Sequence, residues 1–295
     1  FPYERLCELR PGIIYVSNCG FGHTGPYRQF RTWGPIVQAV CGLTWSVGQA
    51  DQPSAGFGLS YMDHHGANLM VFAILAALHH RRRTGEGQWI DMSTVESGAA
   101  LLGPTVLDHT VNGQAARRAG MPASNRGHHP QLAPHGIHPA LGDDQWVAVV
   151  CRTDAEWSRL AEIIGIDEPA WATLSARLHH HDALDERVSA YTRRHDKYAV
   201  QARLLAAGIP AAAVQSPQER IDLDASTAAW GLFPEVSHPL MGPTRVDGIP
   251  LHLSATDWTM STGAPTLGQH NHQVLSGLLG LDDDEIARLE ADGVI

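Results

Sequence analysis

The feature that most constrains this chain is a long apolar segment, residues 67–83, which lies between two short β-rich segments. Its apolar residues recur at helical spacing on more than one side, which predicts a helix buried within a domain. A glycine-containing turn at residues 84–87 ends it, as helix C-caps usually do. Residues 13–17 and 88–92 are typical of strands, and Ser93 is suited to cap a second helix. The strand–helix–strand–helix order predicts a parallel α/β sheet.

The remainder of the chain alternates predicted elements with loops rich in glycine and proline. Residues 112–136, dominated by Gly, Pro, Asn and His, are expected to form a hinge between two lobes. Outside the hinge, the pattern predicts helical structure over 35–47, a loop over 48–62, a β-hairpin over 136–150, a helix over 154–164, helical structure over 177–207, a short strand over 209–214 and two short helices near the C-terminus.

The composition of the 295-residue chain is that of a globular protein, with 43% hydrophobic residues. The formal net charge is −10, from 31 acidic and 21 basic residues, and Lys197 is the single lysine. An acidic chain without a basic stripe disfavours nucleic acid as a partner. The one basic cluster, residues 81–83, suits the C-terminus of a helix. No apolar run reaches membrane-spanning length, so no membrane partner is expected.

The four cysteines, Cys7, Cys19, Cys41 and Cys151, form no Cys-x-x-Cys pair and fit no zinc or disulfide framework. Reduced thiols and a cytoplasmic location are therefore expected. The N-terminal sequence is not a signal peptide. It also lacks an initiator methionine, which indicates that the chain does not begin at a natural gene start.

Three glycines, Gly20, Gly22 and Gly25, spell G-x-G-x-x-G after the first predicted strand. A dinucleotide site would also need a helix that opens at this loop and a carboxylate about twenty residues later. Pro26 follows at once, residues 27–32 show no helical period, and no carboxylate lies near Trp45. NAD and FAD are therefore disfavoured. Two interpretations remain, a turn that lets backbone approach backbone and a loop that lines another ligand site.

The 18 histidines raise the hypothesis of a metal site. A metal needs a defined ligand geometry, and no His-Glu-x-x-His or similar motif is present. The sequence favours loop histidines at the hinge and no metal. The clustered histidines are His128, His129, His135 and His138, followed later by the run 179–181.

Several segments together resemble class III (CaiB/BaiF-type) CoA-transferases, and their order and spacing hold across nearly the whole chain. The matching segments are Ile14-Tyr15 with Gly20-Phe-Gly-His-Thr-Gly25-Pro26, Ile74-Leu-Ala-Ala-Leu78, Arg83-Thr-Gly-Glu-Gly-Gln88, Ile90-Asp-Met-Ser93, Ala133-Pro-His-Gly136, Ala264-Pro-Thr-Leu-Gly-Gln-His-Asn271 and Gly293-Val-Ile295.

The resemblance implies an α/β fold with a Rossmann-like large domain, a smaller α+β domain and an interlocked homodimer. On this basis residues 1–115 are expected to be the remainder of the large domain. Residues 116–220 would form the small domain, and residues 221–295 would return to the large domain. Family members carry on the order of a hundred more residues at the N-terminus, so the chain is expected to be a fragment, a cleaved product or a subunit whose partner supplies that segment.

Asp63 lies where this family places its catalytic aspartate. The resemblance implies that its carboxylate attacks an acyl-CoA, passes through an anhydride and an aspartyl-CoA thioester, and delivers CoA to a carboxylic acid. CoA and acyl-CoA would be substrates, and no cofactor would be covalently bound. A carboxylate needs no base to act as a nucleophile, and a helix N-terminus suits an anion. The alternative for Asp63 is a plain helix N-cap.

Neighbouring residues are weaker site predictions. His64 and His65 are placed to donate to an oxyanion, although a surface role is the alternative, and Gly66 leaves room for a thioester. Arg31 is basic where some transferases place a residue toward CoA, and a surface arginine is equally consistent. The approximate place of the flexible glycine loop known from formyl-CoA transferases holds residues 125–131, which puts oxalate-type specificity in doubt.

Trp33 occupies the position at which related racemases have a histidine base. An indole N–H donates only, so it cannot shuttle a proton, and this favours transfer over racemisation. Two hypotheses compete with CoA transfer: an acyl-CoA racemase, isomerase or lyase of the same fold, and a truncated, non-catalytic homologue that acts as a subunit.

Overall fold

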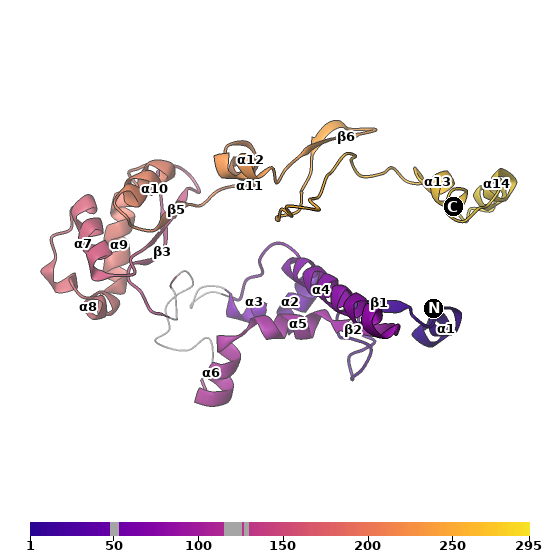
Figure 1. Ribbon diagram of the computed structural model, residues 1–295. Coiled ribbons are helices and arrows are strands. Elements are labelled where there is room, and N and C mark those ends of the chain that lie inside the picture. The colour runs from indigo at the N-terminus through magenta and orange to yellow at the C-terminus, as the bar shows by residue number, and fades with distance from the viewer. Residues whose placement is uncertain (48–52, 115–125, 127–129) are drawn as a thin grey trace. The chain divides into compact units, whose positions relative to one another are not determined.

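A computed structural model of the chain describes residues 1–47, 53–114, 126 and 130–295. The chain divides into two units, Phe1–Ala213 and Val214–Ile295. Figure 1 labels helices and strands of both. The predicted boundary between residues 115 and 116 and most of the predicted hinge lie outside the described residues. The three-part domain division therefore stays a prediction.

Two strands near the N-terminus form the parallel pair that the sequence predicts. Strand β1 (Ile14–Cys19) pairs with β2 (Gln88–Ser93) in a register that runs from Ile14 opposite Gln88 to Cys19 opposite Ser93. Because both strands run the same way, their carboxyl ends meet at one edge. The helices of this region are α1 (Tyr3–Leu9), α2 (Gly34–Val40), α3 (Leu43–Ser46), α4 (Tyr61–Thr84), α5 (Thr94–Leu101) and α6 (Pro104–Asn112).

The helical structure predicted over residues 35–47 is confirmed, and it consists of two helices, α2 and α3. Gly42 separates them in a left-handed conformation, with φ of 94°. A residue with positive φ cannot continue a right-handed helix, and glycine adopts that conformation without steric cost. The chain therefore turns between α2 and α3.

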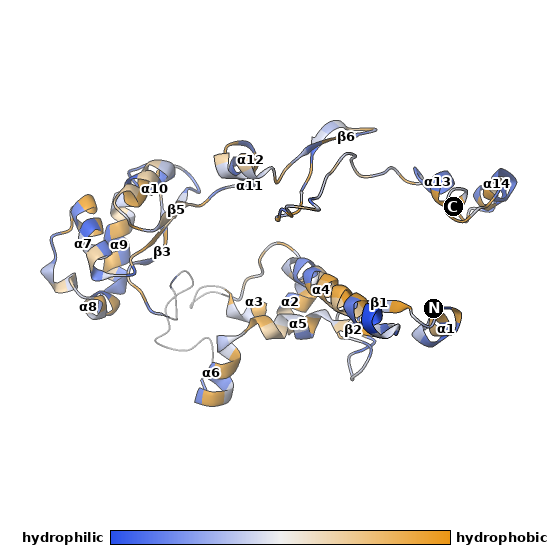
Figure 2. Ribbon diagram, in the orientation of Figure 1, coloured by the Kyte–Doolittle hydropathy of each residue, from blue (hydrophilic) through white to orange (hydrophobic). Residues whose placement is uncertain are grey.

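Helix α4 is the long helix of the apolar segment, and it begins at Tyr61 rather than near residue 67. Gly85 ends it in the left-handed conformation that the sequence predicts, with φ of 83°. The predicted burial on several sides is wrong: Phe72 is 72% exposed and Leu75 is 59% exposed. Figure 2 shows apolar residues along much of this helix and a hydrophilic end, where its last turn holds three arginines. Only one face packs against the strands.

The core of this region is small and joins three helices. Val37 of α2 and Cys41, the C-cap of that helix, pack with Met62 of α4 and Val95 of α5, and Met62 is fully buried. Ser93 caps α5 as predicted, since its side chain accepts a hydrogen bond from the Glu96 backbone N–H. The core therefore fixes the first turn of α4 against the helices on either side of it in sequence.

The second part of unit Phe1–Ala213 is an antiparallel sheet with helices. Its strands lie in the order β3 (His135–Pro139), β4 (Trp146–Val150) and β5 (Ala211–Ala213). The predicted hairpin, helix, helical region and short strand are confirmed here. The helical elements are α7 (Asp154–Ile164), the 3₁₀ turn Pro169–Trp171, α8 (Leu174–His179), α9 (His181–Thr192) and α10 (Lys197–Ala206).

Arg177 of α8 carries a charge and is nevertheless fully buried. Its guanidinium donates to the carbonyl oxygens of Ala133 at 2.7 Å and Trp171 at 3.0 Å, and to Oδ1 of Asp154 at 2.7 Å. A buried guanidinium is tolerated because its donors are satisfied in this way. One side chain thus joins the start of β3 to helix α7.

Unit Val214–Ile295 holds short elements joined by extended loops. The two C-terminal helices confirm the prediction, and Asp282 and Glu285 form a capping box at the last of them. Among the described residues, no helix is long and apolar enough to cross a membrane. The elements of this unit are α11 (Pro217–Asp222), α12 (Ala225–Trp230), β6 (Glu235–His238), β7 (Gly242–Arg245), α13 (Asn271–Leu275) and α14 (Asp283–Ala291).

Two histidines of the second sheet region are buried rather than placed in hinge loops. His138 lies in β3 and is 2% exposed, and His181 begins α9 and is 7% exposed. The loop prediction for His135 and His138 is wrong, because their segment pairs with β4 along its whole length. His128 and His129 lie outside the described residues. Burial lowers the pKa of His138 and of His181, against the opposing effect of the Asp185 carboxylate.

These pKa shifts predict that acid destabilises the fold through His138. Its folded pKa lies below the unfolded value of about 6.5, so the unfolded chain binds more protons as the pH falls. Stability should therefore decline as the pH falls through about 6.5, by up to about 1.4 kcal/mol per pH unit for each such histidine. Urea unfolding of His138→Gln should show a shallower decline than the wild type. His109→Gln, at an exposed position of α6, should keep the wild-type decline, and an equal decline in all three proteins contradicts the prediction.

Candidate functional site

Asp63 is the third residue of α4, within the first turn of the helix. The cap position belongs to Ser60, whose carbonyl accepts the Asp63 backbone N–H at 3.0 Å. The plain N-cap alternative for Asp63 is therefore wrong. Its side chain is exposed, and within the described part of the chain the carboxylate has no hydrogen-bond or ion-pair partner. An ionised carboxylate held at a helix N-terminus and open to solvent is free to react with a ligand.

Gly34, the first residue of α2, lies directly against the start of α4. A Cβ at this buried position would lie 2.5 Å from both Cβ and Oγ of Ser60 and 3.0 Å from Oδ2 of Asp63. Real Cβ atoms almost never come so near, so α2 can approach the carboxylate only with glycine here. Because Gly34 has no side chain, α2 packs closely against the start of α4, and this contact fixes the position of Asp63 relative to α2.

Gln38 of α2 anchors the residues that precede α4. It is 2% exposed, and its Nε2 donates to the carbonyl oxygen of Leu59 at 2.8 Å. The same carbonyl accepts the Tyr61 backbone N–H at 2.9 Å. Gln38 is not among the site residues predicted above, although a lone amide within the apolar stretch 35–47 is a signal that a buried acceptor needs a partner.

The three residues after Asp63 lie on different sides of α4. Gly66 is buried, and a Cβ there would lie 3.3 Å from Cγ2 of Thr94 and 3.4 Å from Cε of Met92. This glycine faces the β2–α5 junction, and its predicted role toward a thioester stays a prediction. His64 is exposed and His65 is half-buried, so their predicted role as donors also stays a prediction.

The glycine loop after β1 is held against β2 and α5. The Gly20 carbonyl accepts the Val95 backbone N–H at 2.9 Å and the Ser93 hydroxyl at 3.1 Å. Any side chain at Gly20 would overlap Thr32. No helix opens at this loop, because the next helix begins at Gly34. The packing supports a turn in which backbone approaches backbone, one of the two interpretations that the sequence left open.

Arg31 and Trp33 lie at the end of this loop, and both are exposed. Trp33 is 78% exposed and immediately precedes α2, next to Gly34. The loop therefore brings its tryptophan to the helix that contacts Asp63. The predicted contacts of Arg31 and Trp33 with a substrate stay predictions.

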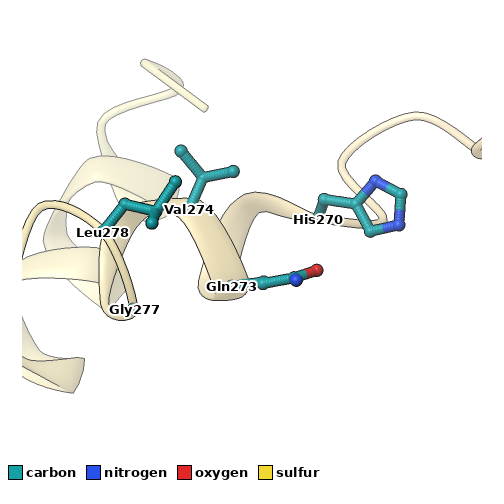
Figure 3. A pocket seen from close by; sticks show the side chains of 5 residues that line it. All are labelled: His270, Gln273, Val274, Gly277 and Leu278. Atoms are coloured by element: carbon teal, nitrogen blue, oxygen red, sulfur yellow. The ribbon is translucent and has the colours of Figure 1, made fainter. Parts of the chain in front are cut away.

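A shallow groove of about 430 Å³ lies in the C-terminal unit, at α13. His270, Gln273, Val274, Gly277 and Leu278 line it, and Figure 3 shows Val274 and Leu278 beside each other on α13 and the turn after it. The groove belongs to unit Val214–Ile295, whereas Asp63 belongs to unit Phe1–Ala213. Its lining is mostly apolar and contains one histidine, so the groove by itself holds few groups that could take part in catalysis.

The chain matches known proteins along almost its whole length. The model of CoA-transferase family III matches residues 1–271. A succinyl-CoA–D-citramalate CoA-transferase of Chloroflexus aurantiacus is 32% identical over 99% of this chain and 72% of that protein. A succinate–glutarate CoA-transferase of Agrobacterium fabrum is 30% identical over 94% of this chain and 68% of that protein.

The fold is also similar to solved structures. A crystal structure of a CAIB/BAIF family protein from Brucella suis superposes with a TM-score of 0.83 and is 26% identical, over 94% of this chain and 71% of that one. The similarity supports the α/β fold that the sequence predicts.

The close contact at Gly34 predicts that an added methyl group displaces the start of α4. Gly34→Ala should lower the free energy of unfolding by about 1–3 kcal/mol, the usual cost of overpacking, as measured by urea denaturation. Gly56→Ala is the matched control, since a Cβ there meets nothing within 4 Å. It should leave stability unchanged or raise it slightly. Equal stability of the two variants would show that α2 and α4 are not in tight contact.

Proposed function

Because the chain belongs to CoA-transferase family III, we propose that it moves CoA from an acyl-CoA donor to a carboxylic acid acceptor, with Asp63 as the covalent nucleophile. The observation that carries this proposal is the exposed, unpaired Asp63 carboxylate in the first turn of α4. Most exposed carboxylates are solvated surface groups. Asp63 differs because a buried glycine and a buried glutamine fix the backbone around it.

The first half-reaction uses the carboxylate as it stands. An oxygen of Asp63 attacks the thioester carbonyl carbon, the carbon–sulfur bond breaks, and CoA leaves as a thiolate. The product of this step is a mixed anhydride between Asp63 and the donor acyl group. The thiolate then attacks the Asp63 carbonyl carbon of the anhydride and releases the donor acid as a carboxylate. The enzyme now holds CoA as an aspartyl thioester.

The second half-reaction repeats these steps in reverse order, with the acceptor acid in place of the donor acid. The acceptor carboxylate attacks the aspartyl thioester and expels CoA thiolate, which leaves a second anhydride. The thiolate attacks the acceptor carbonyl carbon, forms the product thioester and frees Asp63. Each nucleophile and each leaving group is an anion, so no proton has to be moved by a general acid or base.

The surroundings of Asp63 support charge stabilisation rather than proton transfer. Asp63 lies in the first turn of α4, where the positive end of the helix dipole favours the negative charge that develops on the anhydride and thioester oxygens. His64 and His65 follow directly in the chain, and we propose that they donate to the oxyanion. Gly20, Gly22, Arg31, Trp33 and Gly66 are proposed to contact CoA or the acyl group.

The substrates are proposed to be carboxylic acids and their CoA thioesters. The relatives are named for succinyl-CoA and D-citramalate, for succinate and glutarate, and for formyl-CoA and oxalate. Succinyl-CoA is therefore the first donor to assay, with small dicarboxylic acids as acceptors. The same proposal includes a cytoplasmic location, no covalently bound cofactor and a dimer, whether a homodimer or a complex with a partner that completes the site.

Racemisation, isomerisation and elimination on the same fold are the second candidate. Each requires a base that removes a proton from the acyl chain, and the residue before α2 is Trp33, which cannot accept one. Incubation of the protein with an acyl-CoA in D₂O, without any acceptor acid, tests this candidate. Deuterium at the α-carbon would favour it over transfer.

The nucleophile proposal predicts that Asp63→Asn abolishes CoA exchange. Removal of the attacking oxygen should lower the exchange rate at least about a thousandfold, measured with succinyl-CoA and labelled succinate. Glu96→Gln is a matched control, because Glu96 is likewise an exposed carboxylate at the third position of its helix, α5. It should retain nearly full exchange. Retained exchange in Asp63→Asn would rule out the nucleophile.

Covalent trapping separates catalysis from a passive subunit role. Mass spectrometry of the wild-type protein incubated with acyl-CoA should detect a CoA adduct on the peptide that holds Asp63, and hydroxylamine should convert it to a hydroxamate. Asp63→Asn should carry neither modification. A protein that binds CoA without exchange or adduct would instead be the non-catalytic subunit.

A further inference from the structure

Three side chains with different metal-binding atoms converge at the carboxyl edge of the parallel strands. Cys19 is the last residue of β1, His23 lies in the glycine loop, and Asp91 lies in β2. One ligand atom from each lies within 4.8 Å of the other two. The sequence predicts no metal, because the cysteines fit no zinc framework and no His-Glu-x-x-His or similar motif is present. Asp91, moreover, is 68 residues from His23 along the chain.

The contacts converge on one atom, Nδ1 of His23. Sγ of Cys19 lies 3.7 Å from it and Oδ1 of Asp91 lies 3.0 Å from it. A nucleophilic triad would use both ring nitrogens of the histidine, one toward the thiol and the other toward the carboxylate. Here thiol and carboxylate face the same nitrogen, so the arrangement is not a triad. It is the arrangement of three ligands around a common centre.

The distances fit a tetrahedral ion. Zinc bonds of about 2.3 Å to sulfur, 2.0 Å to nitrogen and 2.1 Å to oxygen place tetrahedral sulfur and nitrogen ligands about 3.5 Å apart, and nitrogen and oxygen ligands about 3.4 Å apart. The observed 3.7 Å and 3.0 Å lie within about half an ångström of those separations. Small rotations of the side chains are enough to admit the ion.

The surrounding contacts hold the ligands in place before any ion binds. The His23 backbone N–H donates to both Asp91 oxygens, at 3.0 and 3.2 Å, which fixes the carboxylate. Gly22 passes over that carboxylate with φ of +73°, and a Cβ there would lie 3.7 Å from Oδ2. Trp89 meets the His23 ring edge to face, with centroids 5.3 Å apart. Such contacts orient metal ligands and raise affinity.

We propose that Cys19, His23 and Asp91 bind one divalent cation of the zinc type, with water at the fourth position. The mixed sulfur, nitrogen and oxygen set suits a borderline-soft ion such as Zn²⁺ over Mg²⁺ or Ca²⁺. The His23 and Asp91 side chains are 46% and 27% exposed, so an ion and its water have access. The ion ties the glycine loop to both strands.

When the ion binds, the Cys19 thiol gives up its proton and coordinates as a thiolate, and His23 coordinates through Nδ1 as an imidazole whose ring proton is on Nε2. About one proton is therefore released per ion bound. Cys151 illustrates the contrast with a thiol that cannot take this role, since burial raises its pKa to about 12.

Cobalt(II) absorption spectroscopy tests the site, because it reports the ligands of the ion. Titration of the reduced full chain with Co²⁺ should give one equivalent of bound ion, a thiolate-to-cobalt charge-transfer band in the near ultraviolet and the strong visible bands of a tetrahedral complex. Zn²⁺ should bleach these bands. The thiolate band is diagnostic, because weak binding of cobalt by the 18 histidines of the chain produces no such band.

Variants distinguish the three ligands from accidental binding. Cys19→Ser should lose the charge-transfer band, and His23→Asn and Asp91→Asn should bind cobalt at least about tenfold more weakly. Cys7→Ser, which alters the other partly exposed cysteine, should keep the band and the affinity. Circular dichroism without metal establishes that each variant is folded. The proposal is overturned if wild-type protein gives no thiolate band, or if the band and affinity survive in His23→Asn and Asp91→Asn.

Discussion

The parallel pairing of β1 with β2 is the constraint on which the N-terminal region depends. Its register places Cys19 opposite Ser93 and Ser17 opposite Asp91. The glycine loop, the cap of α5 and the Asp91 carboxylate therefore meet at one edge. A slip of one residue would turn Asp91 to the opposite face of the sheet and would break its contacts with His23.

Much of this architecture could be predicted from local patterns. Residues that end or begin elements, such as Gly85 after α4 and Ser93 before α5, act through their own backbone and nearest neighbours, so the sequence predicts them well. The bounds of α7 were predicted in full for the same reason, since Thr153 caps it and Gly165 ends it. The sequence predicts the start of α4 about six residues too late. The buried contacts of Met62, rather than helical periodicity, determine where this helix begins.

Contacts between distant segments could not be predicted in this way. The bond from Gln38 to Leu59 and the four-way bonding of Arg177 depend on which helices meet, and no local pattern encodes that. His135 lies at the end of the predicted hinge, whose composition favours a loop, yet pairing with β4 overrides that composition. Asp63 was found through family motifs. Periodicity alone would have left it an ordinary helix cap.

The glycine loop connects the two sites proposed for this chain. It begins at the Cys19–His23–Asp91 cluster and ends at Trp33, next to the glycine that contacts Asp63. CoA transfer by anions alone needs a carboxylate in a fixed place rather than a proton relay. A cation that ties the loop at His23 would restrict its first half, while Gly20 against Thr32 restricts its second half. The loop would then hold the start of α2 against Asp63 in one conformation. Metal binding and the positioning of the nucleophile would therefore depend on the same ten residues or so of chain.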